Sequence, residues 1–246
     1  MKRIFKTQNI ILFFFGVLFF SACSKDEYYE DGGLAEAKFD GSILQYLETK
    51  PVMFDTIAQI IKLAGLEETF QNEEFTFFAP SDRNIKTLIT NSLNPSLFFV
   101  GLDTIKTLDE IEPAIWRKHL QRYMFKGKNL LKDYPQVDFN LKGTYPGQNY
   151  ISFSGNVSNI GVVFNDIVQM NGNVEVARLK YKGYRQIYLS YIPDFTEPDS
   201  YTENPISTSD IQPNNGVIHV INYTKSWFGL DPGSSDFIND VIQSQR

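Results

Sequence analysis

Cysteine and histidine are nearly absent from this sequence. Its 246 residues include one cysteine, Cys23, and two histidines, His119 and His219. One cysteine excludes an internal disulfide, and three such residues are too few for a structural zinc site with four Cys or His ligands. We therefore expect no metal and no other cofactor, and we expect the hydrophobic core to hold the fold together.

An excess of positive charge is also missing. The chain has 23 Lys and Arg against 29 Asp and Glu, which gives a formal net charge of −6. Proteins that bind nucleic acid neutralise phosphates with clustered basic residues, and this sequence shows no such stripe. Nucleic acid is therefore excluded as a partner.

The common catalytic motifs are absent as well. The chain contains no Gly-x-Ser-x-Gly elbow, no phosphate-binding loop and no His-Glu-x-x-His pair. We predict that the protein is not an enzyme and has no catalytic residues. A hydrolase remains the third alternative, and it would need a pocket that joins His119 or His219 to a Ser or an Asp.

The only long apolar run is at the N-terminus. Lys2, Arg3 and Lys6 precede an apolar segment from Ile10 to Phe20 that is short for a membrane span. The four residues that follow it, Phe20-Ser21-Ala22-Cys23, resemble a bacterial lipobox, with Phe20 where Leu is more usual. The resemblance implies cleavage before Cys23 and lipidation of that residue; the alternative is a free cysteine in an ordinary signal anchor.

An acidic run follows Cys23. The stretch from Ser24 to Asp31 contains four acidic residues, which is typical of a solvated tether. It also resembles the signal that exports some lipoproteins of Gram-negative bacteria to the outer face of the outer membrane. We predict a signal peptide over 1–22, a flexible tether over 23–40, a domain over 41–228 and a C-terminal tail over 229–246. The protein would be anchored in outer-membrane lipid and would face the cell exterior.

The first half of the predicted domain is helical. Capping residues and apolar positions at helical spacing predict helices over 43–47, after Pro51, after Ser81 and after Pro113. On the second of these, the apolar face includes Met53, Ile57 and Ile60. The segment 91–109 reads as irregular, and Gly127 reads as the stop of the last helix.

The second half is predicted to be rich in strands. Aromatic residues make up 15% of the chain, which suits a β-rich core. Turn residues separate candidate strands at 137–141, 150–153, 161–164, 174–181 and 186–192, whereas 193–213 reads as a long loop. The stretch from Asn215 to Asn222 is apolar on both faces, which predicts a strand covered on both sides. Asn215-Gly216 is expected to supply a tight turn with positive φ at its entry.

Two of these stretches resemble the signatures of the fasciclin I-type domain. Thr76-Phe77-Phe78-Ala79-Pro80-Ser81-Asp82 is similar to the first signature, and Asn215-Gly216-Val217-Ile218-His219-Val220-Ile221 is similar to the second. Between them, Leu120-Gln121-Arg122-Tyr123 is similar to the family's Leu-x-x-Tyr-His segment, with Met124 in place of the His. The resemblance implies an α+β fold, in which a wedge-like β-sandwich is flanked by several α-helices. It assigns structural roles to Pro80, Ser81, Asp82, Tyr123, Asn215, Gly216 and His219.

Further candidate sites follow from single residues. We predict that His219 forms a buried hydrogen bond to the turn at Pro80-Ser81. Tyr184, Tyr188 and Tyr191 are candidates for an exposed aromatic strip that binds glycan or protein. Thr56 and Thr104 stand in Asp-Thr-Ile sequences that resemble O-glycosylation sites of some outer-membrane lipoproteins.

The function indicated is that of a lipid-anchored, non-enzymatic binding or adhesion module at the cell surface, with a protein or glycan ligand. The alternative is an accessory lipoprotein of a nutrient importer for glycans or peptides, docked on a TonB-dependent channel and its lidding lipoprotein. The loops at 91–109 and 145–213 are longer than the family pattern. They are either where such a partner binds or extra loop length without a binding role.

Overall fold

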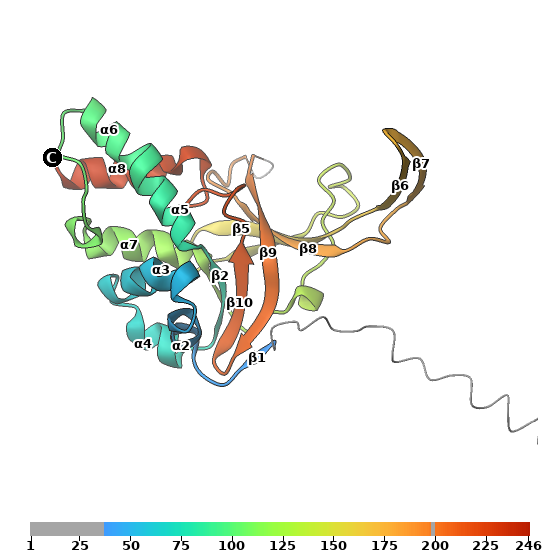
Figure 1. The fold of residues 1–246 in the computed structure, drawn as a ribbon, viewed down its shortest axis with the longest axis horizontal. Coiled ribbons are helices and arrows are strands. Elements are labelled where there is room, and N and C mark those ends of the chain that lie inside the picture. Colours follow the sequence, from blue (N-terminus) through green and yellow to red (C-terminus); the bar gives the residue numbers. More distant parts are fainter. Residues whose placement is uncertain (1–36, 198–199) are drawn as a thin grey trace, which may run out of the picture. The chain divides into compact units, whose positions relative to one another are not determined.

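Strand β10 (Gly216–Ile221) lies at the centre of the fold in the computed structural model, which describes residues 37–197 and 200–246 (Figure 1). All six of its residues are buried. It pairs in parallel with β2 (Phe75–Ala79) and antiparallel with β9 (Thr202–Pro213). The prediction of a strand covered on both faces is therefore confirmed.

The main sheet is nearly closed. Its strand order is β3-β2-β10-β9-β8-β5-β4, with the short β1 paired to β9. Phe125 in β3 forms a bridge with Ser152, directly after β4, so the two ends of the order approach each other. The remaining strands are β1 (Lys38–Phe39), β3 (Met124–Lys126), β4 (Gln148–Ile151), β5 (Val157–Phe164) and β8 (Arg185–Tyr191). A separate two-stranded sheet consists of β6 (Ile167–Asn171) and β7 (Val174–Leu179).

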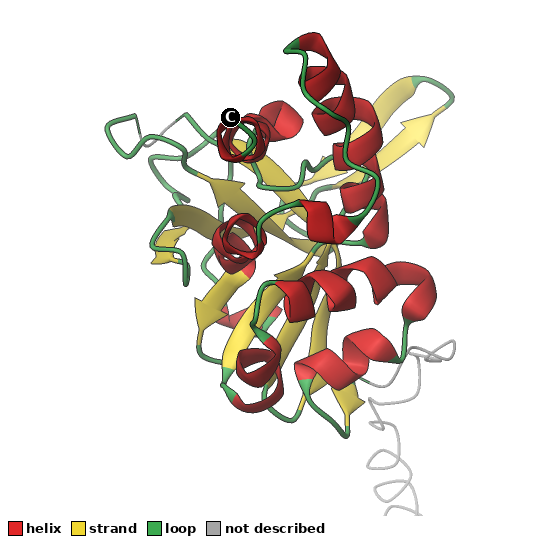
Figure 2. Cartoon of the chain, turned by 90° about the vertical axis from the view of Figure 1, so that its left-hand side faces the viewer, coloured by secondary structure: helices red, strands yellow, loops and turns green. Residues whose placement is uncertain are grey.

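The helices gather on one side of the sheet (Figure 2). They are α2 (Ile43–Glu48), α3 (Pro51–Leu63), α4 (Glu67–Asn72), α5 (Asp82–Thr87), α6 (Asn94–Phe99), α7 (Pro113–Leu120) and α8 (Ser235–Ser244). A π-helical segment (Leu88–Leu93) joins α5 to α6, and short 3₁₀ turns occur at Leu108–Glu110, Gln121–Tyr123, Leu131–Asp133 and Pro232–Ser234. The mixture of a strand sheet and a helical layer confirms the predicted α+β class.

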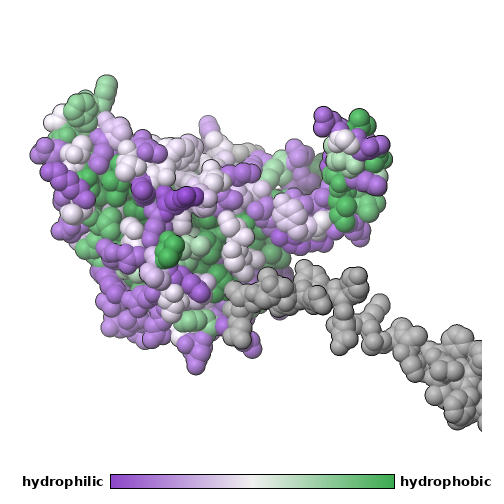
Figure 3. Space-filling view, in the orientation of Figure 1, coloured by the Kyte–Doolittle hydropathy of each residue, from purple (hydrophilic) through white to green (hydrophobic). Residues whose placement is uncertain are grey.

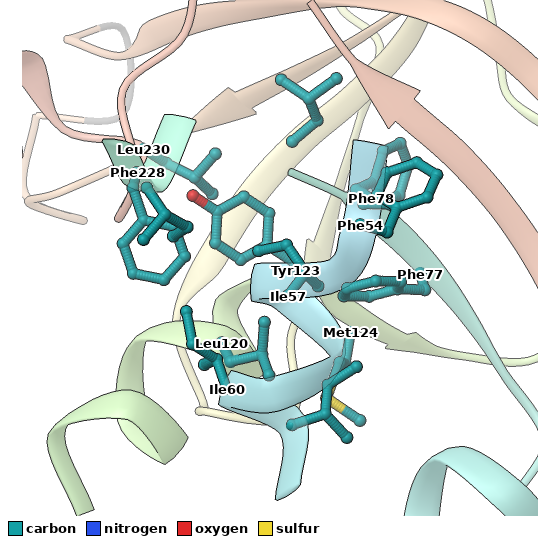
Figure 4. Packing of buried hydrophobic residues seen from close by; sticks show 14 of the residues in the cluster. Phe54, Ile57, Ile60, Phe77, Phe78, Leu120, Tyr123, Met124, Phe228 and Leu230 are labelled. Carbon is teal, nitrogen blue, oxygen red and sulfur yellow. The ribbon is translucent and has the colours of Figure 1, made fainter. Parts of the chain in front are cut away.

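One hydrophobic core lies between the helices and the sheet. In Figure 4, Tyr123 is surrounded by α3 residues and by Phe228 and Leu230 of the C-terminal segment. The ends of the core helices follow sequence rules. Gly65, at φ +64°, ends α3, and the N–H of Leu66 donates to the carbonyl of Ile61 at 3.0 Å, which is the geometry of a Schellman motif.

Two segments predicted to be irregular are regular. The predicted loop 193–213 contains the 12-residue strand β9. Its Pro, Ser and Asp residues disfavour a strand locally, but pairing with β8 and β10 on either side outweighs that preference. The segment 91–109 is largely helical, since it contains the end of the π-helical segment, α6 and a 3₁₀ turn. Conversely, the candidate strand 137–141 is absent, and only its first residue, Val137, forms an isolated bridge, with Pro146.

Three predicted boundaries are also wrong. Helix α7 ends at Leu120 and is followed by β3, so Gly127 ends a strand and not a helix. The predicted tether extends too far, because Lys38–Phe39 form β1. The segment 229–246 is not a peripheral tail: Leu230, Phe237 and Val241 are fully buried, because α8 packs beside α7. Most of this segment forms α8.

The predicted signal peptide and Cys23 lie outside the described residues. Among the residues that are described, no helix combines the length and the apolar character needed to cross a bilayer.

Candidate functional site

The two sequence signatures lie side by side. Parallel strands β2 and β10 place His219 opposite Phe78 and Val220 opposite Ala79. Both strands therefore end at the same edge of the sheet, with Pro80 and Ser81 after one and Ile221 at the end of the other. The two signatures thus belong to one structural unit, because segments about 140 positions apart in sequence pair as neighbouring strands.

Asn215 and Gly216 position the start of β10. The Asn215 side chain accepts a hydrogen bond from the N–H of Ile43 at 2.8 Å and donates to the carbonyls of Phe70 and Glu73 at 3.1 and 2.9 Å. Neither Asn215 nor Gly216 has positive φ, so the predicted turn geometry is wrong. Glycine is required for another reason, because a Cβ at Gly216 would collide with the Phe75 carbonyl.

Ser81 and Asp82 position α5 against its neighbours. The Asn84 side chain accepts from the Ser81 N–H at 2.9 Å, which ties the start of α5 to the end of β2. Asp82 Oδ1 accepts from the N–H of Ile57 at 3.1 Å, which links α5 to α3. These contacts agree with the structural roles predicted for both residues.

A groove of about 870 Å³ lies where these elements meet. Its walls come from the end of α2, the first turns of α3, the start of α5, and the β9 and β10 strands. The volume falls in the range of small-molecule sites, roughly 300–1,000 Å³. The residues that line it are Tyr46, Thr49, Lys50, Pro51, Val52, Met53, Phe54, Thr56, Ser81, Asp82, Arg83, Lys86, Ser207, Thr208, Val220, Ile221 and Tyr223.

The groove was not predicted from the sequence, although one signal for it existed. Met53 fits the apolar face of α3 by spacing, yet it is 47% exposed, and its neighbour Val52 is 99% exposed. Val52, Met53 and Phe54 are three successive apolar residues that together span about 200° of the helix, which is more than the apolar stripe that faces the core. That excess of apolar surface in the sequence marks the wall of the groove.

Neither histidine reaches this groove. His219 is fully buried, and its Nδ1 accepts from the Asp210 N–H at 3.2 Å while Nε2 lies 3.0 Å from the Asn129 carbonyl. A neutral ring that donates through Nε2 satisfies both contacts. The predicted bond to the turn at Pro80-Ser81 is therefore wrong in its partner, but the predicted buried structural role is what the structure shows. Burial lowers the pKa of His219 to about 4.

The side chain of His119 is also buried, and it contacts a carboxylate. Its Nε2 lies 2.7 Å from Asp240 of α8, and its ring packs edge-on against Phe237. Burial and the nearby Arg122 lower its pKa to about 4, against the opposing effect of Asp240. His119 is therefore a core histidine on the buried face of α7.

Tyr123 anchors the C-terminal segment. Its hydroxyl accepts from the Gly229 N–H at 2.8 Å, and its ring stacks on Phe228 at a centroid distance of 5.7 Å. Burial raises its pKa above the usual range. The tyrosine of the middle motif is therefore sealed inside the domain and acts structurally.

The predicted aromatic strip does not exist as a surface. Tyr184 is 68% exposed, Tyr188 is half-buried against Phe139, and Tyr191 is only 1% exposed beneath Arg122. Residues 188 and 191 are three apart on β8 (Arg185–Tyr191), and side chains at that spacing point to opposite faces of a strand. The predicted strip therefore combines Tyr188 with Tyr191, although the side chains of these two residues lie on opposite faces of β8.

The chain before β8 instead forms an exposed β-hairpin. We call β6 and β7 with their turn, residues 167–179, the arm; it projects from the domain and shows hydrophobic surface (Figure 3). Every residue of both strands is exposed. The apolar side chains exposed on the arm are Ile167, Val168, Met170, Val174, Val176 and Leu179. Apolar patches of this kind often mark sites of interaction.

The base of the arm is held firmly. Asp166 accepts from the Tyr181 N–H at 2.8 Å and pairs with Arg178 at 2.8 Å. The Tyr181 hydroxyl donates to Asp138 at 2.9 Å, and Tyr181 itself has φ +58°, which is uncommon for a residue with a side chain. These contacts set the direction in which the arm projects.

The two threonines differ in setting. Thr104 is exposed in the loop after α6, whereas Thr56 is half-buried within α3 and lines the groove. Of the two O-glycosylation predictions, only the one at Thr104 falls on an exposed loop; both remain predictions.

No family model matches this chain, and no curated protein matches it. Among solved structures, it is similar to a FAS1 domain pair from the insect cell adhesion molecule Fasciclin I, with a TM-score of 0.48 and 17% sequence identity. The match covers 82% of this chain and 52% of that chain, so this chain corresponds to about half the length of the solved pair.

Replacing His219 is expected to destabilise the fold. His219→Leu leaves the Asp210 N–H and the Asn129 carbonyl without their partner, and each buried group that loses its hydrogen bond costs about 1–3 kcal/mol. We expect the free energy of unfolding to fall by about 3 kcal/mol. Urea unfolding followed by circular dichroism measures this, and a midpoint equal to that of the unmodified protein would contradict the assigned bonds.

Removing the arm is expected to leave stability almost unchanged. Replacing residues 167–179 with a short glycine-containing turn deletes exposed side chains and one partly exposed ion pair, that of Arg178 with Asp166, so the loss of unfolding free energy should stay below about 1 kcal/mol. A thermal melt of the shortened protein should therefore match that of the full chain. A clear drop in melting temperature would show that the arm packs on the domain.

Proposed function

We propose that this chain is a non-enzymatic binding module at the cell surface, used in adhesion or ligand capture. The observation that carries the proposal is the groove at the shared ends of β2 and β10, the two strands that contain the fasciclin-like signatures. Among the described residues, the groove contains no histidine, while the residues common to the signatures shape its walls. These features suit recognition and not proton transfer.

Anchoring through Cys23 completes the proposal. The lipobox-like sequence supports lipidation, and the acidic run after it supports transfer to the outer face of the outer membrane. Labelling cells with an alkyne-bearing palmitate should tag the unmodified chain but not a Cys23→Ala variant. Protease treatment of intact cells should then degrade the tagged protein; protection from protease would place it on the inner side of the membrane.

The test of function is mass spectrometry of what co-purifies with the tagged, lipidated protein from mildly solubilised outer membranes. Recovery without a stoichiometric partner is expected for a free-standing binding module. A stoichiometric TonB-dependent channel and its lidding lipoprotein would instead make the chain an accessory subunit of a nutrient importer.

One observation favours that second function. The arm presents six exposed apolar side chains on a two-stranded ribbon whose outer edges are unpaired. If the importer function holds, the arm-shortened protein should lose the channel partner while it keeps its lipid anchor. If the channel still co-purifies with the shortened protein, the arm is not the docking surface.

A further inference from the structure

The groove combines apolar walls with exposure to solvent. Val52, Met53 and Tyr223 are 99%, 47% and 45% exposed, while Phe54 and Ile221 on the same lining are buried. Apolar surface removed from water is stabilised by roughly 25 cal/mol per Å². A ligand that covers this lining therefore needs an apolar body.

Positive charge is concentrated along the same lining. Lys50, Arg83 and Lys86 border the groove, and none of the ion pairs formed among the described residues involves them. The Arg83 guanidinium lies 4.6 Å from the centre of the Tyr223 ring, so it joins the charged and apolar parts of the lining.

Among the described residues, the lining has one carboxylate, which already accepts a hydrogen bond. Asp82 Oδ1 accepts the Ile57 N–H, so it serves the link between α5 and α3. The groove therefore carries an excess of three cations over one carboxylate on a chain whose formal net charge is −6. Such a local reversal of sign attracts an anionic group to this groove and away from the acidic remainder of the surface.

We infer that the groove binds an anionic amphiphile, a molecule with a single acyl chain and a carboxylate head. The acyl chain lies against Val52, Met53 and Tyr223, and the carboxylate is met by Lys50, Arg83 and Lys86. This inference deepens the proposed binding function and rests on it, since it states which chemical class the module captures.

The experiment uses the full lipidated chain in phosphatidylcholine nanodiscs and a diazirine-bearing fatty acid of twelve carbons. After irradiation, peptide mass spectrometry should place the label on residues of the groove lining. Free dodecanoate should compete about tenfold better than dodecanol, because the alcohol lacks the charge. Each methylene removed from the competitor should weaken it roughly two- to fourfold, from about 0.8 kcal/mol per buried CH₂.

Three variants make the test specific. Ser207→Trp fills the groove from an exposed position on β9 and should abolish the labelling while the melting temperature is kept. Lys50→Glu with Lys86→Glu should lower competition by dodecanoate about tenfold but leave dodecanol unchanged. The matched control is Lys126→Glu, an exposed lysine on β3 outside the groove, which should have no effect.

Three results would overturn the inference: labelling spread over the whole surface, labelling unaffected by Ser207→Trp, or equal competition by dodecanoate and dodecanol. If any of them occurs while adhesion or a channel partner is retained, the ligand chemistry fails and the binding module stands. If adhesion and partners are absent too, the proposed function fails with it.

Discussion

Acidification from pH 6.5 to pH 4 should cost the domain up to about 5 kcal/mol of unfolding free energy, roughly 2.5 kcal/mol for each histidine. In the folded protein, burial lowers the pKa of both His119 and His219 to about 4. In the unfolded chain both would titrate near 6.5. Between these values the unfolded state binds more protons than the folded state, so stability is present above pH 6.5 and is lost as the pH falls toward 4.

Two partly desolvated carboxyls reduce the net loss. Burial raises the pKa of Asp210 and of Glu203, so both take up a proton more readily in the folded state and oppose the histidines at low pH. Asp210 lies 3.9 Å from His219, so the charge of its carboxylate contributes to the electrostatic environment of the His219 ring.

The measurement is urea unfolding at half-unit steps from pH 7.5 to pH 4. The slope of stability against pH should be shallower in His219→Leu, because one of the two titrating rings is gone. A stability that is level between pH 6.5 and pH 4.5 would contradict the buried, neutral state of the histidines.

Replacing Arg122 should release the C-terminal segment. Arg122 is 3% exposed, donates to the Gly229 carbonyl at 2.9 Å and pairs with Asp236 at 2.9 Å. Asp231, also buried, lies 3.6 Å away. Arg122→Met leaves that carboxylate without its cation, and breaking a buried pair in this way costs about 3–5 kcal/mol.

Hydrogen exchange locates the effect. In Arg122→Met, amides between Phe228 and Val241 should exchange faster than in the unmodified chain, while those of β2 and β10 change less. The control is Lys118→Met, which removes an exposed partner of Asp240 and should cost less than about 1 kcal/mol. Equal losses in the two variants would contradict the assigned role of Arg122.

Much of the fold could be predicted because local rules decide it. The Schellman end of α3, the proline starts of α3 and α7 and the doubly apolar β10 depend on residues close to one another in sequence. The α+β class follows from the same local patterns. Strand β9 could not be predicted, because its Pro and Ser residues form a strand only through pairing with β8 and β10.

The candidate site was predictable only in part. Its framework residues Ser81, Asp82, Asn215 and Gly216 were identified through the family resemblance, whereas Val52, Arg83 and Tyr223 were not. The latter residues matter only because α3, α5 and the chain after β10 meet in space. The aromatic strip shows the converse error, since the odd spacing of Tyr188 and Tyr191 on β8 already places their side chains on opposite faces.

The sequence by itself determined where α2, α3, α5 and α7 begin, which strand is central and which residues carry the two signatures, because backbone capping and hydrophobic periodicity act over a few residues. Only the tertiary structure decided the partners of His219, the burial of the C-terminal segment, the exposure of the arm and the existence of the groove. Each of these depends on side chains brought together from distant parts of the chain, where packing and desolvation outweigh local preference.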